Sequence, residues 1–125
     1  MKYMLCFILA LSLAACSSKS GKEEKELATQ AFINCDFYGA IDNSKIAIQH
    51  ADDNLEVSVP ALLILGKSFE LLDNEAAASS AYENIVRLAP GVTTLSEAKQ
   101  IADNFVEQLS KTVPQKIENC PALQS

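Results

Sequence analysis

Between residues 23 and 109 the apolar residues recur every three or four positions, which is the spacing of one face of an α-helix. No stretch shows the sustained two-residue alternation that is typical of a half-buried β-strand. Polar or helix-breaking segments interrupt the pattern four times. The sequence therefore predicts an all-α domain with short antiparallel connections, built from about five helices over residues 23–35, 40–48, 59–72, 77–88 and 94–109.

Two of these helices carry recognisable start signals. Ser58 precedes Val59 and Pro60, so it is a candidate N-cap with proline in the first turn, where the missing N–H costs least. Thr94 and Glu97 have the spacing of a capping box. We therefore expect the segment 51–56 to be a turn and the last helix to start after Thr94.

The composition fits one packed domain and argues against one class of partner, nucleic acid. The chain has 125 residues, of which 49% are hydrophobic, and that length allows a single domain. The formal net charge of −6 argues against nucleic acid, because phosphate binding needs clustered Lys and Arg. We expect no nucleic-acid partner.

The first residues read as a targeting signal. One lysine precedes an apolar run over 5–13, far shorter than the roughly 20 residues of a membrane-spanning helix. The run ends in Leu13-Ala14-Ala15-Cys16, which resembles the lipobox of bacterial lipoproteins. The alternative is an ordinary cleaved signal with a coincidental cysteine.

The lipobox resemblance implies a domain organisation and a location. Residues 1–15 would be cleaved, Cys16 would carry lipid and anchor the protein to a membrane, and residues 16–22 would form a short tether. Ser17 resembles the outer-membrane sorting pattern, so the helical domain over 23–112 and the tail over 113–125 would lie in the periplasm, with display on the cell surface left open. Loss of Lys2 leaves nine Lys and Arg against sixteen Asp and Glu, a formal charge of −7.

Two cysteines then remain in the mature domain, Cys35 and Cys120. Thiols in the oxidising periplasm commonly pair, and this pair would tie the C-terminal tail to the first helix. The alternative is that Cys35 is a small buried hydrophobe and Cys120 a free thiol. Two cysteines and one histidine without ligand spacing predict no metal site.

The helices also repeat. The spacing of Leu65-Gly66, Phe69, Ala78, Tyr82 and Pro90 resembles that of a tetratricopeptide repeat. The resemblance implies that small residues at 66 and 78 let the paired helices touch, while large residues at 69 and 82 fill the gap to the neighbouring pair.

Fainter copies flank this repeat and imply a short solenoid. The upstream copy lies 38 residues earlier, and because the family period is 34 we expect its four extra residues in the connection over 54–58. A half-copy over 98–105 would supply the last stacking helix, and an unrelated helical bundle remains the alternative. Since two and a half repeats are near the minimum for a continuous core, a disulfide or a partner would add stability.

In tetratricopeptide proteins the first helices of the pairs line a groove that binds a peptide or a helix. Carried over to this chain, the resemblance implies partner-binding positions at Thr29, Phe32, Leu63, Lys67, Glu70, Lys99 and Asp103. Phe32 and Leu63 have the equally reasonable interpretation that they belong to the core.

Residues for catalysis are not evident. His50 is the only histidine and lies beside two aspartates, which is typical of a solvated surface residue. No nucleophile elbow and no glycine-rich phosphate loop are present. We expect no enzyme, no cofactor and no small-molecule substrate.

The sequence thus favours a lipid-anchored periplasmic adaptor that binds a protein or peptide and helps to assemble an envelope or secretion complex. The alternative is a pilotin-like carrier that escorts a secretin subunit to the outer membrane, since some pilotins share the size, the helices and a disulfide.

Overall fold

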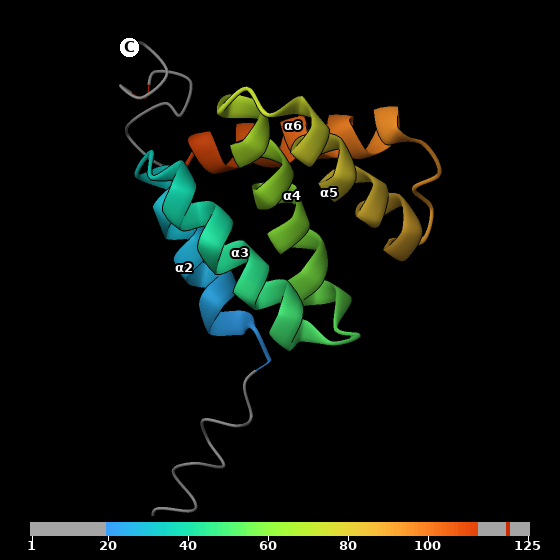
Figure 1. Cartoon of the computed structure of the whole chain (residues 1–125), viewed down its shortest axis with the longest axis horizontal. Coiled ribbons are helices and arrows are strands. Elements are labelled where there is room, and N and C mark those ends of the chain that lie inside the picture. Colours follow the sequence, from blue (N-terminus) through green and yellow to red (C-terminus); the bar gives the residue numbers. More distant parts are fainter. Residues whose placement is uncertain (1–19, 113–119, 121–125) are drawn as a thin grey trace, which may run out of the picture.

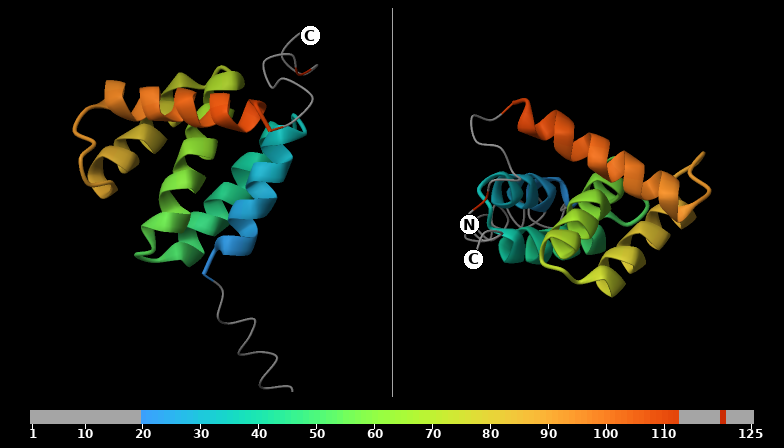
Figure 2. Two further views of the ribbon diagram at one scale, coloured as in Figure 1. Left: turned by 180° about the vertical axis from the view of Figure 1, so that it is seen from behind. Right: turned by 90° about the horizontal axis from the view of Figure 1, so that it is seen from above.

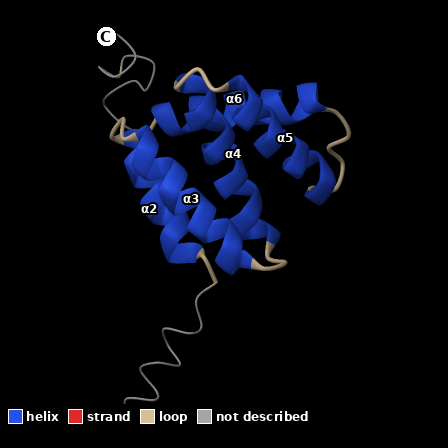
Figure 3. Cartoon of the chain, viewed as in Figure 1, coloured by secondary structure: helices blue, strands red, loops and turns tan. Residues whose placement is uncertain are grey.

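The computed structural model describes residues 20–112 and residue 120. These residues form helices joined by turns, with no strand among them (Figure 3), so the predicted all-α fold of antiparallel hairpins is confirmed. The five helices are α2 (Lys22–Ile33), α3 (Phe37–Ala51), α4 (Leu55–Leu71), α5 (Glu75–Leu88) and α6 (Leu95–Ser110). The predicted signal peptide, the lipidation site at Cys16 and the tail apart from Cys120 lie outside the described residues.

Consecutive helices pack against each other, and the last one turns back over the others. The pairs α2–α3, α3–α4 and α4–α5 run antiparallel (Figure 1). Helix α6 then lies across the upper end of α4 instead of alongside it, and it ends beside the turn between α2 and α3 (Figure 2). The C-terminal half of α6 therefore closes the molecule over its N-terminal hairpin.

Polar side chains start four of the five helices. Each accepts a hydrogen bond from a backbone N–H in the first turn and so satisfies a donor that the helix itself leaves unpaired. These N-caps are Asp36, Asn54, Asn74 and Thr94. The capping box predicted at Thr94 is confirmed, because Glu97 accepts the backbone N–H of Thr94 at 3.2 Å while Thr94 Oγ1 accepts that of Glu97 at 3.1 Å.

The predicted start of the third helix is wrong by one turn. Helix α4 begins at Leu55 after its N-cap Asn54, and Ser58 lies inside the helix, where its hydroxyl donates to the Asn54 carbonyl at 3.2 Å. The earlier start buries Val57, which a turn would have left exposed. Residues 55–58, which we expected in the connection, are therefore the first turn of α4.

Gly66 makes a close contact with α5. A Cβ atom on Gly66 would lie 2.8 Å from Cζ of Tyr82, so the tyrosine ring rests directly on the glycine backbone. Ala78 is buried one turn earlier on α5. The missing side chain at Gly66 thus accommodates the Tyr82 ring.

The helical domain begins slightly earlier than predicted. Gly21 is buried at the start of α2 with a φ of 86°, and a Cβ there would collide with the carbonyl oxygen of Ala47 and lie 3.0 Å from Cγ1 of Val57. Gly21 and Lys22 therefore belong to the packed domain and not to the tether.

A cluster of buried side chains joins α6 and Cys120 to the hairpin of α2 and α3. Phe32 and Phe37 pack edge to face with ring centroids 5.4 Å apart, and Val106 of α6 and Cys120 pack against the same cluster. Val106 of α6 thereby helps to bury the two phenylalanines on either side of the turn between α2 and α3.

Candidate partner-binding site

Four of the predicted partner-binding residues come together where α6 crosses α4. Lys67 Nζ donates to Asp103 Oδ1 at 2.7 Å and lies 3.0 Å from Glu70 Oε1. Glu70 Oε2 lies 3.1 Å from Lys99 Nζ, so the carboxylate is held between two lysines. The four side chains form one ion network that links the two helices.

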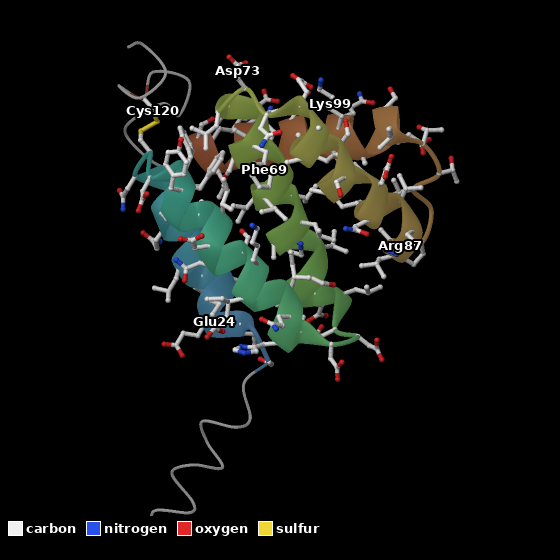
Figure 4. All side chains as sticks on the ribbon, in the orientation of Figure 1. Glu24, Phe69, Asp73, Arg87, Lys99 and Cys120 are labelled. Carbon is white, nitrogen blue, oxygen red and sulfur yellow. A yellow bond between two sulfur atoms is a disulfide. The ribbon has the colours of Figure 1, made fainter. Side chains whose placement is uncertain are left out.

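The four side chains differ in solvent exposure, which divides the network into an inner and an outer pair. The side chains of Lys67 and Glu70 are 15% and 11% exposed, whereas those of Lys99 and Asp103 are 53% and 55% exposed. Figure 4 shows Lys99 at the upper surface of the molecule. The outer pair is therefore the half that a partner reaches first.

The lysine pKa values reflect these contacts. Burial lowers the pKa of Lys67, but the hydrogen bonds to Asp103 and Glu70, with the two negative charges, outweigh burial and raise it above its usual value. The hydrogen bond to Glu70 raises the pKa of Lys99 as well. Both lysines are therefore cations at neutral pH.

Tyr82 of α5 borders the network. Its side chain is buried, and its hydroxyl lies near the Glu70 carboxylate. Burial raises the pKa of Tyr82, and the charges of Glu70, Asp103 and Glu75 raise it further. The phenol is therefore neutral and keeps its proton.

A surface cavity of about 300 Å³ lies beside this network. Residues of three helices line it: Glu70, Glu75, Ala78, Ser79, Tyr82, Leu95, Ser96 and Lys99. The lining combines apolar surface with charged and hydroxyl groups, as small binding pockets commonly do. The cavity is a candidate binding site that includes two of the predicted residues, Glu70 and Lys99.

The remaining three predicted residues do not reach this site. Phe32 is fully buried and Leu63 is 4% exposed, so neither is available to a partner. Their other interpretation, as core residues, agrees with the structure, because Phe32 packs with Val106 and Cys120 in one buried cluster and Leu63 belongs to another. Thr29 lies on α2, where its hydroxyl donates to the Lys25 carbonyl at 2.9 Å.

Several lining residues were missed by the sequence analysis. Glu75, Ser79 and Tyr82 lie on one face of α5, at positions three and four apart. Their spacing was visible in the sequence, but the repeat resemblance placed the groove on the first helices of the pairs. The crossing of α6 over α4 brings this face next to Ser96 and Lys99.

At the opposite end of α6, the structure links the sulfur atoms of Cys35 and Cys120 (Figure 4), whose Cα atoms are 5.6 Å apart. Cys35 lies in the turn after α2 with a φ of 66°, and Cys120 is fully buried. The pair suggested by the cysteine count is thus adjacent in space. The free-thiol alternative would leave two facing sulfurs unjoined.

Comparison of the chain with protein-family models, with curated proteins and with solved structures found no match. Over residues 20–112 and 120, no helix is both long and apolar enough to cross a membrane. The same residues contain no group of three or more His, Cys, Asp or Glu side chains arranged to hold a metal ion.

Proposed function

We propose that this protein is a lipid-anchored adaptor of the bacterial cell envelope, which holds a protein or peptide partner close to the outer membrane. Its helical domain would lie in the periplasm. The binding role rests on one observation, the cavity of about 300 Å³ that α4, α5 and α6 enclose beside the ion network.

The anchor is supported by the sequence and by the position of Gly21. Cys16 ends a lipobox, and Gly21 is already packed against Ala47 and Val57. Four residues separate Cys16 from Gly21, so a fully extended link spans about 17 Å. Such a tether keeps the domain, and any partner bound to it, near the membrane surface.

The binding role is supported by the composition of the cavity. Its apolar lining gives a partner side chain area to bury, and its charged rim gives orientation. The fixed ion pairs of Glu70 with Lys67 and Lys99 hold the rim side chains before a partner arrives.

The anchor is tested by fractionating cells that produce the full chain or its Cys16→Ser variant. We expect fatty-acid label and membrane retention for the unaltered chain and neither for the variant. Equal partition of both proteins into the membrane fraction would overturn the anchor.

The binding role is tested with a photocrosslinking amino acid placed at Ser79, inside the cavity, or at Asp42, on the exposed face of α3. In cells, we expect position 79 to crosslink to a defined envelope protein and position 42 to give no such product. Absence of a specific product from position 79 would overturn the cavity as the partner-binding site.

A pilotin-like carrier is the second candidate, and the Cys35–Cys120 link across a small helical domain favours it. The two functions differ in their deletion phenotype. Loss of a carrier leaves a secretin subunit away from the outer membrane, whereas loss of an adaptor depletes or misorders a complex whose subunits still reach their membranes.

A further inference from the structure

The cavity between α4, α5 and α6 carries an uncompensated negative charge. Both carboxylate oxygens of Glu70 already face lysines, at 3.0 Å from Lys67 and 3.1 Å from Lys99. Glu75, on the opposite wall, is exposed and has no ion-pair partner within residues 20–112. With Asp103, the local sum is three carboxylates against two ammonium groups.

The same three carboxylates act on Tyr82. Its hydroxyl is buried beside the cavity, where Glu70 acts on it both as a charge and as a hydrogen-bonding group. Glu70, Asp103 and Glu75 all act on this hydroxyl in the same direction, and their charges raise the Tyr82 pKa after burial has done so. The electrostatic potential at the tyrosine is therefore negative, which favours a cation.

The apolar part of the lining suits a long aliphatic stem. Leu95 supplies most of the apolar surface that a partner can reach, because it is 41% exposed, whereas Tyr82 and Ala78 also line the cavity but are only 3% and 1% exposed. Lysine and arginine bury their methylene stems on such surfaces while the charged end stays near water.

We propose that this cavity receives a lysine or arginine side chain from the partner protein, with the stem on Leu95 and the cationic group at Glu75. This inference rests on the proposed function and specifies the chemistry of its partner. The partner segment is therefore basic, and it complements a mature chain whose formal charge is −7.

The probe is Nα-acetyl-arginine amide, titrated into the ¹⁵N-labelled mature lipoprotein in detergent micelles. We expect saturable shifts of the backbone amides of Ser79 and Ser96 with a dissociation constant in the millimolar range, as befits so small a ligand. Nα-acetyl-norleucine amide tests the stem alone and Nα-acetyl-glutamate amide tests the opposite charge. Saturation by the glutamate probe, or by no probe, would overturn the proposal.

Two variants that change the charge of the cavity in opposite directions test the sign of the ligand's charge. Glu75→Gln is expected to weaken arginine binding about two- to fivefold, and Lys99→Gln to strengthen it by a similar factor. Glu107→Gln, at an exposed position near the end of α6, is the control and should change nothing. The reverse order of the first two variants would show that the bound cation does not lie at Glu75 and would reject the proposal.

The two hypotheses fail differently. Specific crosslinking from position 79 without arginine binding would reject the basic partner and leave the adaptor intact. Arginine binding without a crosslinked protein in cells would reject the adaptor and leave the cavity's preference for cations.

Discussion

Tyr82 contributes both to the packing of α4 against α5 and to the electrostatics of the candidate site. Its ring rests on the backbone of Gly66, and its hydroxyl lies buried near Glu70. The ring is 3% exposed, so it cannot swing into solvent to make room. The glycine at position 66 and the tyrosine at position 82 therefore depend on each other.

Gly66→Ala should destabilise the domain, because the added methyl group collides with the Tyr82 ring. The collision is expected to cost about 1–3 kcal/mol and to exceed the gain of about 1 kcal/mol in helix propensity. Urea denaturation measures the difference in the free energy of unfolding. In a Tyr82→Leu background the same change should be neutral or stabilising, and equal effects in both backgrounds would contradict the contact.

Gly21→Ala should be more harmful than Gly91→Ala, although both glycines have a similar positive φ, 86° and 88°. Alanine in this backbone region costs about 1–2 kcal/mol at either position. At Gly91 a Cβ meets nothing within 4 Å, whereas at Gly21 it collides with the carbonyl oxygen of Ala47. The difference between the two urea midpoints isolates the packing of the domain's first residue, and equal midpoints would show that Gly21 is not docked.

At the scale of helices, short polar signals decide where each element begins. Asp36, Asn54, Asn74 and Thr94 supply the caps, and Glu97 completes a reciprocal pair at the start of α6. Helix α6 is only partly buried, since Ala98, Ala102 and Val106 are its buried residues. Its first turn therefore depends more on capping than the first turn of the apolar α4.

Thr94→Ala should destabilise the domain by about 1 kcal/mol, because it removes the side chain that accepts the Glu97 backbone N–H.

Glu97, the other residue of the capping box, should make the free energy of unfolding depend on pH. The backbone N–H of Thr93, then its hydroxyl and the backbone N–H of Thr94, lower the pKa of Glu97 below its usual 4.5. Because the unfolded chain binds this proton first, the contribution of Glu97 is present above pH 4.5 and is lost as the pH falls below it.

The expected measurement is the free energy of unfolding of the unaltered chain and of Glu97→Gln at pH 7 and about pH 3. The two proteins should differ at pH 7 and converge at the lower pH. Glu107→Gln, later on the same helix, serves as the control, and a difference that persists at low pH would count against the carboxylate's role.

The sequence predicted the individual helices better than the way in which they pack against one another. Periodicity and caps are local, so five helices and the Thr94 box could be found from residues close in the chain. The start of α4 was missed because Asn54 and Ser58 are both good caps, and the burial of Val57 decides between them. Burial depends on neighbours distant in sequence.

The site was predicted in part for the same reason. The network residues lie on α4 and α6, whose exposed polar faces are visible in the helical pattern. Phe32 was assigned both to a groove and to the core, and the sequence could not choose, because the direction in which α6 crosses α4 is set by packing. The same crossing adds Tyr82 and Glu75 to the site.

For the whole molecule, α6 and the cysteine link convert a row of helices into a closed unit. Helix α6 contributes Ala98 and Ala102 to the larger core cluster and Val106 to the cluster around Phe32. Cys120 packs in the second cluster and is joined to Cys35 at the end of the N-terminal hairpin. The two ends of the domain are thereby held together over a sequence separation of 85 residues.

Loss of this link should lower the stability of the entire domain. Closing so long a loop restricts the unfolded chain and is worth at most about 4–5 kcal/mol, and its removal also loosens the cover over Phe32 and Phe37. The oxidised lipoprotein should therefore unfold at a higher urea concentration than Cys35→Ser/Cys120→Ser, and reductant should lower the first midpoint to the second. Non-reducing gels should show a faster band with no alkylatable thiol, because the bridged chain stays more compact in detergent. Stoichiometric alkylation of both cysteines in urea without reductant would show that the sulfurs are not joined, and the closure of the domain would then depend on α6 alone.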